Sequence, residues 1–265
     1  MKVRSSFAVL VAAGALGWAQ GPPGGPGRLG TGPRFLGAEA GVPRRVVKGA
    51  PFSGDLITES TETLPDGNHI RQTSTVHLVR DSEGRTRREA SLAGLGALAS
   101  GGSAQQVIFI YDPVAGASYA LDPVHKTGTR SPWAATMLRS RVAGAVERWR
   151  DARADGNQTP KVETIGPMTI EGLTAQGTRS TVTIPPGEIG NEAPIQIVTE
   201  RWYSADLQMA VLTKRSDPRS GEIITRLTNV TRSEPSPALF QVPADFKVTD
   251  RAAQRFGARS GASGQ

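Results

Sequence analysis

Between Phe52 and Arg232 most of the chain alternates polar and apolar residues, which is the two-residue period of half-buried strands. Short sequences rich in Pro, Asp, Gly and Asn interrupt the alternation and favour tight turns. The pattern therefore predicts antiparallel strands joined by hairpins, the first three of which form a meander. The predicted strands cover residues 52–64, 69–80, 85–91, 107–111, 118–121, 161–165, 168–173, 174–184, 195–203, 208–215 and 222–232.

Two of these strands carry further information. Residues 107–111 (Val-Ile-Phe-Ile-Tyr) are apolar throughout, which is typical of a strand buried on both faces. Residues 85–91 instead place arginines on both faces, through Arg85, Arg87 and Arg88. We interpret this second strand as an edge of the sheet, where charge prevents pairing with other chains. Contact with an anionic partner is the alternative.

One segment follows the helical period. Ser131 is a candidate N-cap, Pro132 suits the first helical position, and the helix is expected to end near residues 155–157. Apolar residues recur at steps of three to five positions, which predicts an apolar stripe along one side of the helix. The predicted stripe consists of Trp133, Met137, Val142, Ala145, Val146 and Trp149. It is expected to pack against the sheet, to line a cavity for an apolar ligand, or to lie on a membrane surface.

The two ends of the chain differ in composition from the strand-rich middle. Residues 1–19 combine two basic residues, a short apolar run and a small-residue cleavage signal, which is the pattern of a secretory signal peptide. Residues 20–50 are rich in Gly, Pro and Arg and predict a disordered arm, and residues 251–265 predict a disordered tail. A single β-rich domain is expected over residues 51–250, and the mature form is expected to lack a transmembrane segment.

The amino-acid composition excludes several classes of chemistry for this protein. The chain has no cysteine, and this excludes disulfides, thiol catalysis and cysteine-ligated zinc. The net charge is +7, but several arginines lie in the predicted arm, so the folded domain is closer to neutral. For an exported protein we expect no nucleic-acid partner, and anionic components of the cell envelope are the partners that the charge favours.

No motif predicts a reaction. Residues 25–30 match the Gly-x-Gly-x-x-Gly pattern, but no predicted strand precedes them and no helix follows. His69 and His77 lie on one predicted strand at a separation of roughly 27 Å, which is too far to share a metal ion. Glu59 and Glu62 point to opposite faces and do not form a carboxylate pair. We expect no catalytic site, no metal and no cofactor, while a hydrolase site assembled from distant Ser, His and Asp residues stays an alternative.

Three stretches in the last third of the chain resemble a known group of proteins. They are Glu200-Arg201-Trp202-Tyr203, the turn Asp217-Pro218-Arg219-Ser220-Gly221, and the tail Leu239-Phe240-Gln241-Val242-Pro243-Ala244-Asp245-Phe246. This region, residues 195–248, is similar to uncharacterised exported bacterial proteins with the LolA/LolB-type outer-membrane lipoprotein-sorting fold. The resemblance implies a long antiparallel sheet curled into a half-barrel, with helices on its concave face and an apolar cavity for acyl chains. It identifies no ligand-contacting residue, and the Pro/Gly-rich arm and the Arg-rich helix depart from the family.

The expected fold is α+β and mostly β: a curled antiparallel sheet (half-barrel) with one main helix on the concave face. We expect an exported, monomeric binding module of the periplasm or extracellular space. Its expected ligand is apolar or amphipathic and lipid-like, with lipid or lipoprotein acyl chains as partners. The candidate ligand-binding residues are Trp133, Met137, Val142, Trp149 and Trp202, and the Gly/Ala/Leu loop at 92–104 is a candidate flap. The alternative is a structural or interaction protein of the cell envelope without a ligand cavity.

Overall fold

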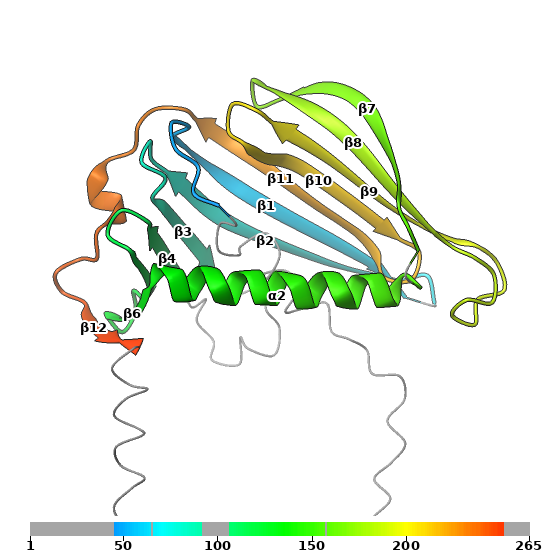
Figure 1. Ribbon diagram of the computed structural model, residues 1–265, viewed down its shortest axis with the longest axis horizontal. Coiled ribbons are helices and arrows are strands. Elements are labelled where there is room, and N and C mark those ends of the chain that lie inside the picture. Colours follow the sequence, from blue (N-terminus) through cyan, green and yellow to red (C-terminus); the bar gives the residue numbers. More distant parts are fainter. Residues whose placement is uncertain (1–44, 65, 92–105, 157, 252–265) are drawn as a thin grey trace, which may run out of the picture. The chain divides into compact units, whose positions relative to one another are not determined.

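Twelve strands form one open, curled sheet in the part of the chain that the structure, a computed structural model, describes (Figure 1). The described residues are 45–64, 66–91, 106–156 and 158–251. The order across the sheet is β12-β6-β5-β4-β3-β2-β1-β11-β10-β9-β8-β7, and only β12 and β6 pair in parallel. The predicted half-barrel is confirmed, because β1 pairs with β11 and so joins both halves of the chain in one sheet.

The strands largely follow the predicted pattern. Their bounds are β1 (Phe52–Thr63), β2 (His69–Arg80), β3 (Thr86–Ser91), β4 (Gln106–Asp112), β5 (Ala117–Asp122), β6 (Thr127–Pro132), β7 (Lys161–Ile170), β8 (Leu173–Ile184), β9 (Ile195–Ser204), β10 (Met209–Asp217), β11 (Gly221–Thr231) and β12 (Lys247–Asp250); the helices are α2 (Trp133–Ala154) and the 3-10 helix η3 (Pro237–Phe240). Strands β6 and β12 are additions to the prediction. The two strands predicted over 161–173 are replaced by the single strand β7, which bulges against β8 between Thr164 and Gly166. The predicted leader, most of the arm, the candidate flap and the tail lie outside the described residues.

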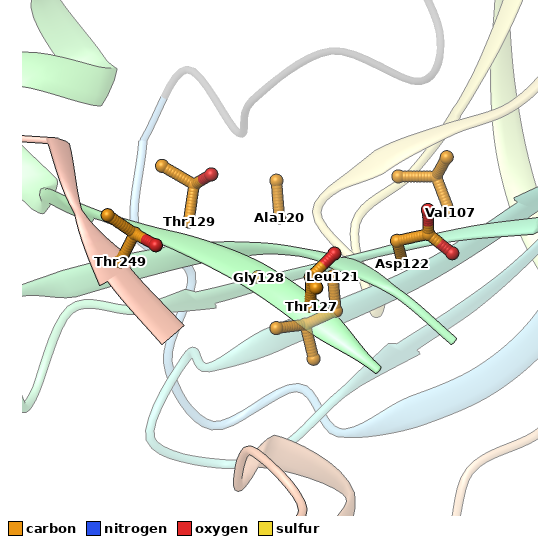
Figure 2. A pocket seen from close by; sticks show the side chains of 8 residues that line it. All are labelled: Val107, Ala120, Leu121, Asp122, Thr127, Gly128, Thr129 and Thr249. Carbon is orange, nitrogen blue, oxygen red and sulfur yellow. The ribbon is translucent and has the colours of Figure 1, made fainter. Parts of the chain in front are cut away.

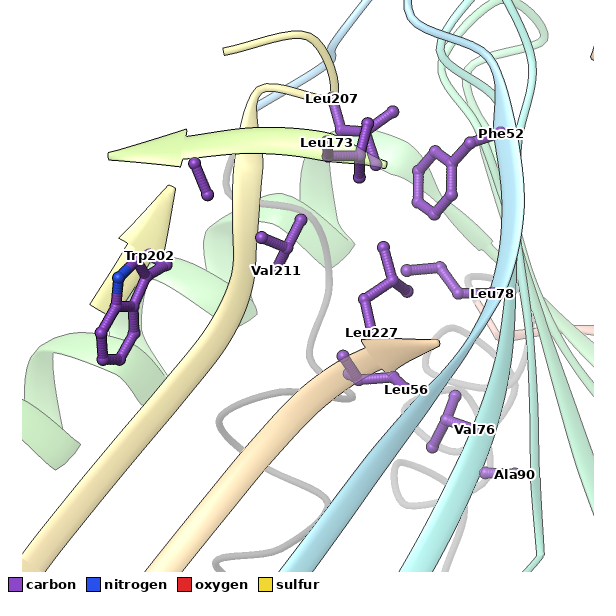
Figure 3. Close-up of a cluster of buried hydrophobic side chains, with 11 residues drawn as sticks. Phe52, Leu56, Val76, Leu78, Ala90, Leu173, Trp202, Leu207, Val211 and Leu227 are labelled. Atoms are coloured by element: carbon purple, nitrogen blue, oxygen red, sulfur yellow. The ribbon is translucent and has the colours of Figure 1, made fainter. Parts of the chain in front are cut away.

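One face of the sheet, called the inner face below, carries the larger core. Leu56 lies opposite Val76 on β2 and Leu227 on β11, so the three side chains share this face. Leu173 at the start of β8 and Leu207 in the β9–β10 turn belong to the same buried cluster (Figure 3). Because residues from distant strands of the sheet meet on the inner face, the sheet curls toward it, and the inner face is the concave one.

The opposite face, called the outer face below, has a smaller core. Val79, Ile110 and Leu121 are buried there, on β2, β4 and β5. Phe240 of η3 completes this cluster, with Phe246 packed beside it. The segment after β11 therefore covers the outer face, and β12 then pairs with β6 at one end of the sheet.

Helix α2 crosses the inner face and is fixed near both of its ends (Figure 1). In its first turn, the Thr136 hydroxyl lies 2.6 Å from the hydroxyl of Ser118 on β5. At the other end, Asp155 follows the helix and accepts a hydrogen bond at 3.1 Å from Arg219 in the β10–β11 turn. The 22 residues of α2 span about 33 Å, and the two anchors lie near its opposite ends. The predicted helix on the concave face is thus confirmed.

Two local predictions are wrong. The arginine-bearing strand is β3, which lies between β2 and β4 instead of at an edge. The interior position is tolerated because Arg87 donates a 2.7 Å hydrogen bond to Glu89, while Arg88 is buried on the inner face. Ser131 does not cap α2, since it pairs with β5 as part of β6 and the cap residue is Pro132, with no side-chain hydrogen bond.

Candidate functional site

Three aromatic side chains form a row where α2 meets the sheet. Phe109 and Tyr111 alternate onto the inner face of β4, with their rings nearly parallel and their centroids 6.4 Å apart. The ring of Trp133 is tilted against Tyr111 at 6.1 Å, and its backbone N–H donates to the Gly116 carbonyl at 2.9 Å. Phe109 and Trp133 are half-buried and Tyr111 is buried. Burial raises the pKa of Tyr111, so its hydroxyl stays neutral at physiological pH.

A hollow of about 350 Å³ lies beside the β5–β6 hairpin (Figure 2). Its walls are Val107, Ala120, Leu121, Asp122, Thr127, Gly128, Thr129 and Thr249. Ala120 lies directly opposite Phe109 across β4 and β5, so the hollow begins next to the aromatic row. The volume is at the lower end of the about 300–1,000 Å³ typical of small-molecule sites. Methyl groups and threonine hydroxyls together suit a molecule that has an apolar part and a polar part.

A buried arginine lies near one end of the aromatic row. Arg80 is opposite Phe52, and its guanidinium lies 4.8 Å from the centre of that ring. It donates hydrogen bonds to the carbonyl oxygens of Ala50 at 2.9 Å and Leu207 at 2.6 Å. Among the described residues no carboxylate forms an ion pair with it, and burial lowers its pKa to about 10. Its charge therefore stays on the inner face at neutral pH.

A second arginine lies beside the aromatic row, on the neighbouring strand β3. Arg88 is opposite Phe109 across β3 and β4, and opposite Leu78 across β2 and β3. Only 8% of its surface is exposed. Its positive charge favours the ionised form of Tyr111 and so opposes the effect of burial on that hydroxyl. The inner face thus combines aromatic surface with buried positive charge, and this gives it electrostatic affinity for an anionic group.

The structure separates the residues that the sequence grouped on α2. Trp133 and Met137 are half-buried, and Trp133 contacts the sheet through Tyr111. Val142 and Trp149 are 56% and 61% exposed. The step of five residues from Met137 to Val142 turns the helix about 140° beyond a full turn. Trp133 is therefore part of the aromatic row, whereas Val142 and Trp149 lie on the exposed side of the helix.

Trp202, the remaining candidate, belongs to the core. It is 8% exposed and belongs to the same buried cluster as Leu173 and Val211 (Figure 3). Gly177 lies opposite it on β8, and a Cβ there would come within 2.7 Å of the indole Nε1. The absence of a side chain at position 177 makes room for the ring. Trp202 therefore packs between strands, away from the aromatic row.

Sequence reasoning missed the strand side of the site. The apolar run at 107–111 was visible, yet which of its residues share a face with α2 depends on pairing with β5 and on where the helix docks. Alternation along β4 separates Phe109 and Tyr111 from Ile108 and Ile110, and this was the available signal. No local signal marks Ala120 as part of a hollow.

Two histidine–aspartate pairs occur in the described residues: His125 with Asp122, at 2.7 Å beside the hollow, and His77 with Asp55 on the outer face. His77 Nδ1 is 2.8 Å from Asp55 Oδ1, and Asn229 donates to the other carboxylate oxygen at 2.8 Å. The hydrogen bonds from Asn229 and then His77 hold the pKa of Asp55 below its ordinary value. In the described ranges no serine hydrogen-bonds to His77. A hydrolase site would need a concave cluster of Ser, His and Asp, and this pair does not form one.

Neither a metal-binding cluster nor a membrane-spanning helix is found in the described residues. In them no group of three or more His, Asp or Glu side chains is arranged to hold a metal ion. None of the helices in the same ranges has the length and apolar character needed to span a bilayer.

Comparison with known proteins gives distant structural likenesses. No protein-family model and no curated protein matches the sequence. The MucA/MucB complex of Pseudomonas aeruginosa aligns over 75% of this chain and 58% of that one, with 13% identity and a TM-score of 0.37. A LolA superfamily protein from Nitrosomonas europaea aligns over 75% and 93%, with 8% identity and a TM-score of 0.31. The lipoprotein LppX of Mycobacterium tuberculosis aligns over 69% and 88%, with 10% identity and a TM-score of 0.31.

The matches include structures described as a LolA superfamily protein and as a putative outer-membrane lipoprotein-sorting domain, at 8% and 6% identity and TM-scores of 0.31 and 0.29. The chain spans only about three fifths of the MucB-containing structures that it matches, 58% and 61% of two of them. At such identities and TM-scores the likeness says nothing of ligand or partner. The residues of this chain have to supply that information.

Proposed function

We propose that the protein is an exported, non-catalytic binding module of the cell envelope that holds an apolar or amphipathic, lipid-like ligand on its inner face. The observation that carries the proposal is the aromatic row of Phe109, Tyr111 and Trp133, in which Phe109 and Trp133 are half-buried, beside a hollow at Ala120. Partly exposed aromatic rings lose unfavourable contact with water when an apolar chain covers them.

Filling the hollow tests the proposal. Ala120→Phe places a ring where the ligand's apolar part would lie. Val124→Phe puts the same ring on the β5–β6 turn, where Val124 is 64% exposed, and serves as the matched control. Both variants add one aromatic side chain to the same hairpin, so a difference between them reports on the hollow itself.

The measurement has two parts. Protein exported with its own leader and purified from a bacterial periplasm is analysed by native mass spectrometry for bound lipid. After removal of lipid, a fluorescent fatty acid is titrated into each variant. We expect bound lipid in the wild type, at least about a tenfold weaker affinity for Ala120→Phe, and less than about a twofold change for Val124→Phe. Absence of bound mass together with absence of fatty-acid uptake would favour the structural or interaction protein instead.

A further inference from the structure

Helix α2 carries an exposed apolar stripe on the side that faces away from the sheet. The stripe, called the outward stripe below, is Leu138, Val142, Val146 and Trp149, which are 64%, 56%, 42% and 61% exposed. Steps of four, four and three residues align these positions on one side of a helix. Isolated apolar residues are common on protein surfaces, but a continuous stripe over three turns of one helix indicates an interaction surface.

The anchors of α2 explain why this stripe is left open. Thr136, which touches Ser118, and Asp155, which binds Arg219, lie on the opposite side of the helix from Val142. The sheet therefore holds the helix through its polar and half-buried side. The outward stripe is not needed for that attachment, so it can contact a partner while α2 remains in place.

The charge of α2 indicates what the partner is. The helix contains five arginines, at positions 139, 141, 148, 150 and 153, against the two acidic residues Glu147 and Asp151. Arg141 and Arg153 are exposed; Arg141 is the sequence neighbour of Val142, and Arg153 follows Trp149 by four residues, about one turn of the helix. Positive positions therefore border the apolar stripe. Trp149 itself has the Arg153 guanidinium 5.5 Å from its ring centre.

We infer that α2 docks on the anionic surface of a lipid bilayer through the outward stripe. An apolar side with tryptophan, bordered by arginine, is the arrangement of helices that lie in the membrane interface. Tryptophan prefers the level of the lipid head groups, and arginine attracts anionic lipids. A second copy of the chain fits less well, because two such helices would bring their arginines together. Docking requires no ligand in the hollow and stands independently of the proposed binding function.

Vesicle binding tests the inference with a charge-neutral change. The double variant Val142→Gln/Val146→Gln removes apolar surface from the outward stripe and keeps every arginine. The control Val114→Gln/Val162→Gln makes the same changes at positions that are 61% and 65% exposed but lie in the β4–β5 turn and in β7. All proteins start at residue 20, the form expected after leader removal, so that the leader itself adds no membrane affinity.

Co-sedimentation is measured with vesicles of phosphatidylcholine alone and of phosphatidylcholine mixed with phosphatidylglycerol. We expect the wild type to prefer the anionic vesicles and to lose affinity between about 0.1 M and 1 M salt, as the Debye length falls from about 10 to 3 Å. The stripe variant should bind at least about tenfold more weakly and the control within about twofold. Equal binding by both variants, or no binding by the wild type, would overturn the inference. Dimerisation that the stripe variant abolishes, without vesicle binding, would assign the surface to a second copy.

Discussion

The C-terminal anchor of α2 can be weakened by a single substitution, Asp155→Asn. The Asp155 side chain is 10% exposed; Arg219 donates to it at 3.1 Å, and Arg215 lies at 3.9 Å. Removing one partner of a fully isolated buried ion pair costs about 3–5 kcal/mol. The cost here is smaller, because asparagine keeps an acceptor oxygen and Arg219 retains Asp217 at 2.8 Å. We expect the free energy of unfolding of this end of the helix to fall by about 1–2 kcal/mol.

Amide hydrogen exchange measures this loss of local stability at the end of α2. A change of about 1–2 kcal/mol corresponds to roughly 5–30-fold faster exchange of the amides in the last turns of α2. The first turn, held by Thr136 and Ser118, should keep its protection. The control is Glu163→Gln, which removes an exposed ion pair with Lys161 and should leave exchange in α2 unchanged. If Asp155→Asn exchanged like this control, Asp155 would not anchor the helix.

Three further substitutions test the sheet. Leu227→Ala should lower the free energy of unfolding by about 2–5 kcal/mol in urea titrations, since this core side chain is 1% exposed. Gly221→Ala should lower the free energy of unfolding by about 1–3 kcal/mol more than Gly67→Ala in the same assay. Both glycines have positive φ (94° and 83°), but of the two only Gly221 lies where a Cβ would overlap the backbone of β1. Burial opposes ionisation of Asp217, yet hydrogen bonds from Arg219 hold its pKa below the ordinary value. The ionised Asp217 carboxylate therefore stabilises the fold fully above about pH 4, and this stabilisation is lost as the pH falls through the lower pKa of the folded state. Asp217→Asn should consequently lower the free energy of unfolding more at about pH 5 than at about pH 2.5.

The strands and hairpins could be predicted from the sequence because their signals are local. Alternation along β1 and β2, and the turn around Gly67, are readable without knowledge of any partner strand. Strand β6 was missed because Thr127–Pro132 has no apolar alternation; its pairing with β5 and β12 defines it. The position of β3 inside the sheet was also beyond local reasoning, since it depends on β4 returning to pair with it.

The candidate site was predictable only in part, and the reason is geometric. The contact of Trp133 with the sheet was predictable because apolar residues on a helix form a visible pattern. Val142 and Trp149 were grouped with Trp133 because a step of five residues was accepted as one stripe, although it turns the helix toward the opposite side. The contribution of Phe109 and Tyr111 required the strand register and the docking of α2, which no sequence period encodes.

Photo-cross-linking tests the placement of the ligand most directly. A fatty acid with a photoreactive group at its chain end is bound to the lipid-free protein, irradiated, and located by peptide mass spectrometry. A ligand on the inner face should label β4 and β5, near Phe109 and Ala120, and the first turn of α2 at Trp133. Labelling confined to the outer face around Phe240, or to the outward stripe at Val142, would contradict a ligand held between the sheet and the helix.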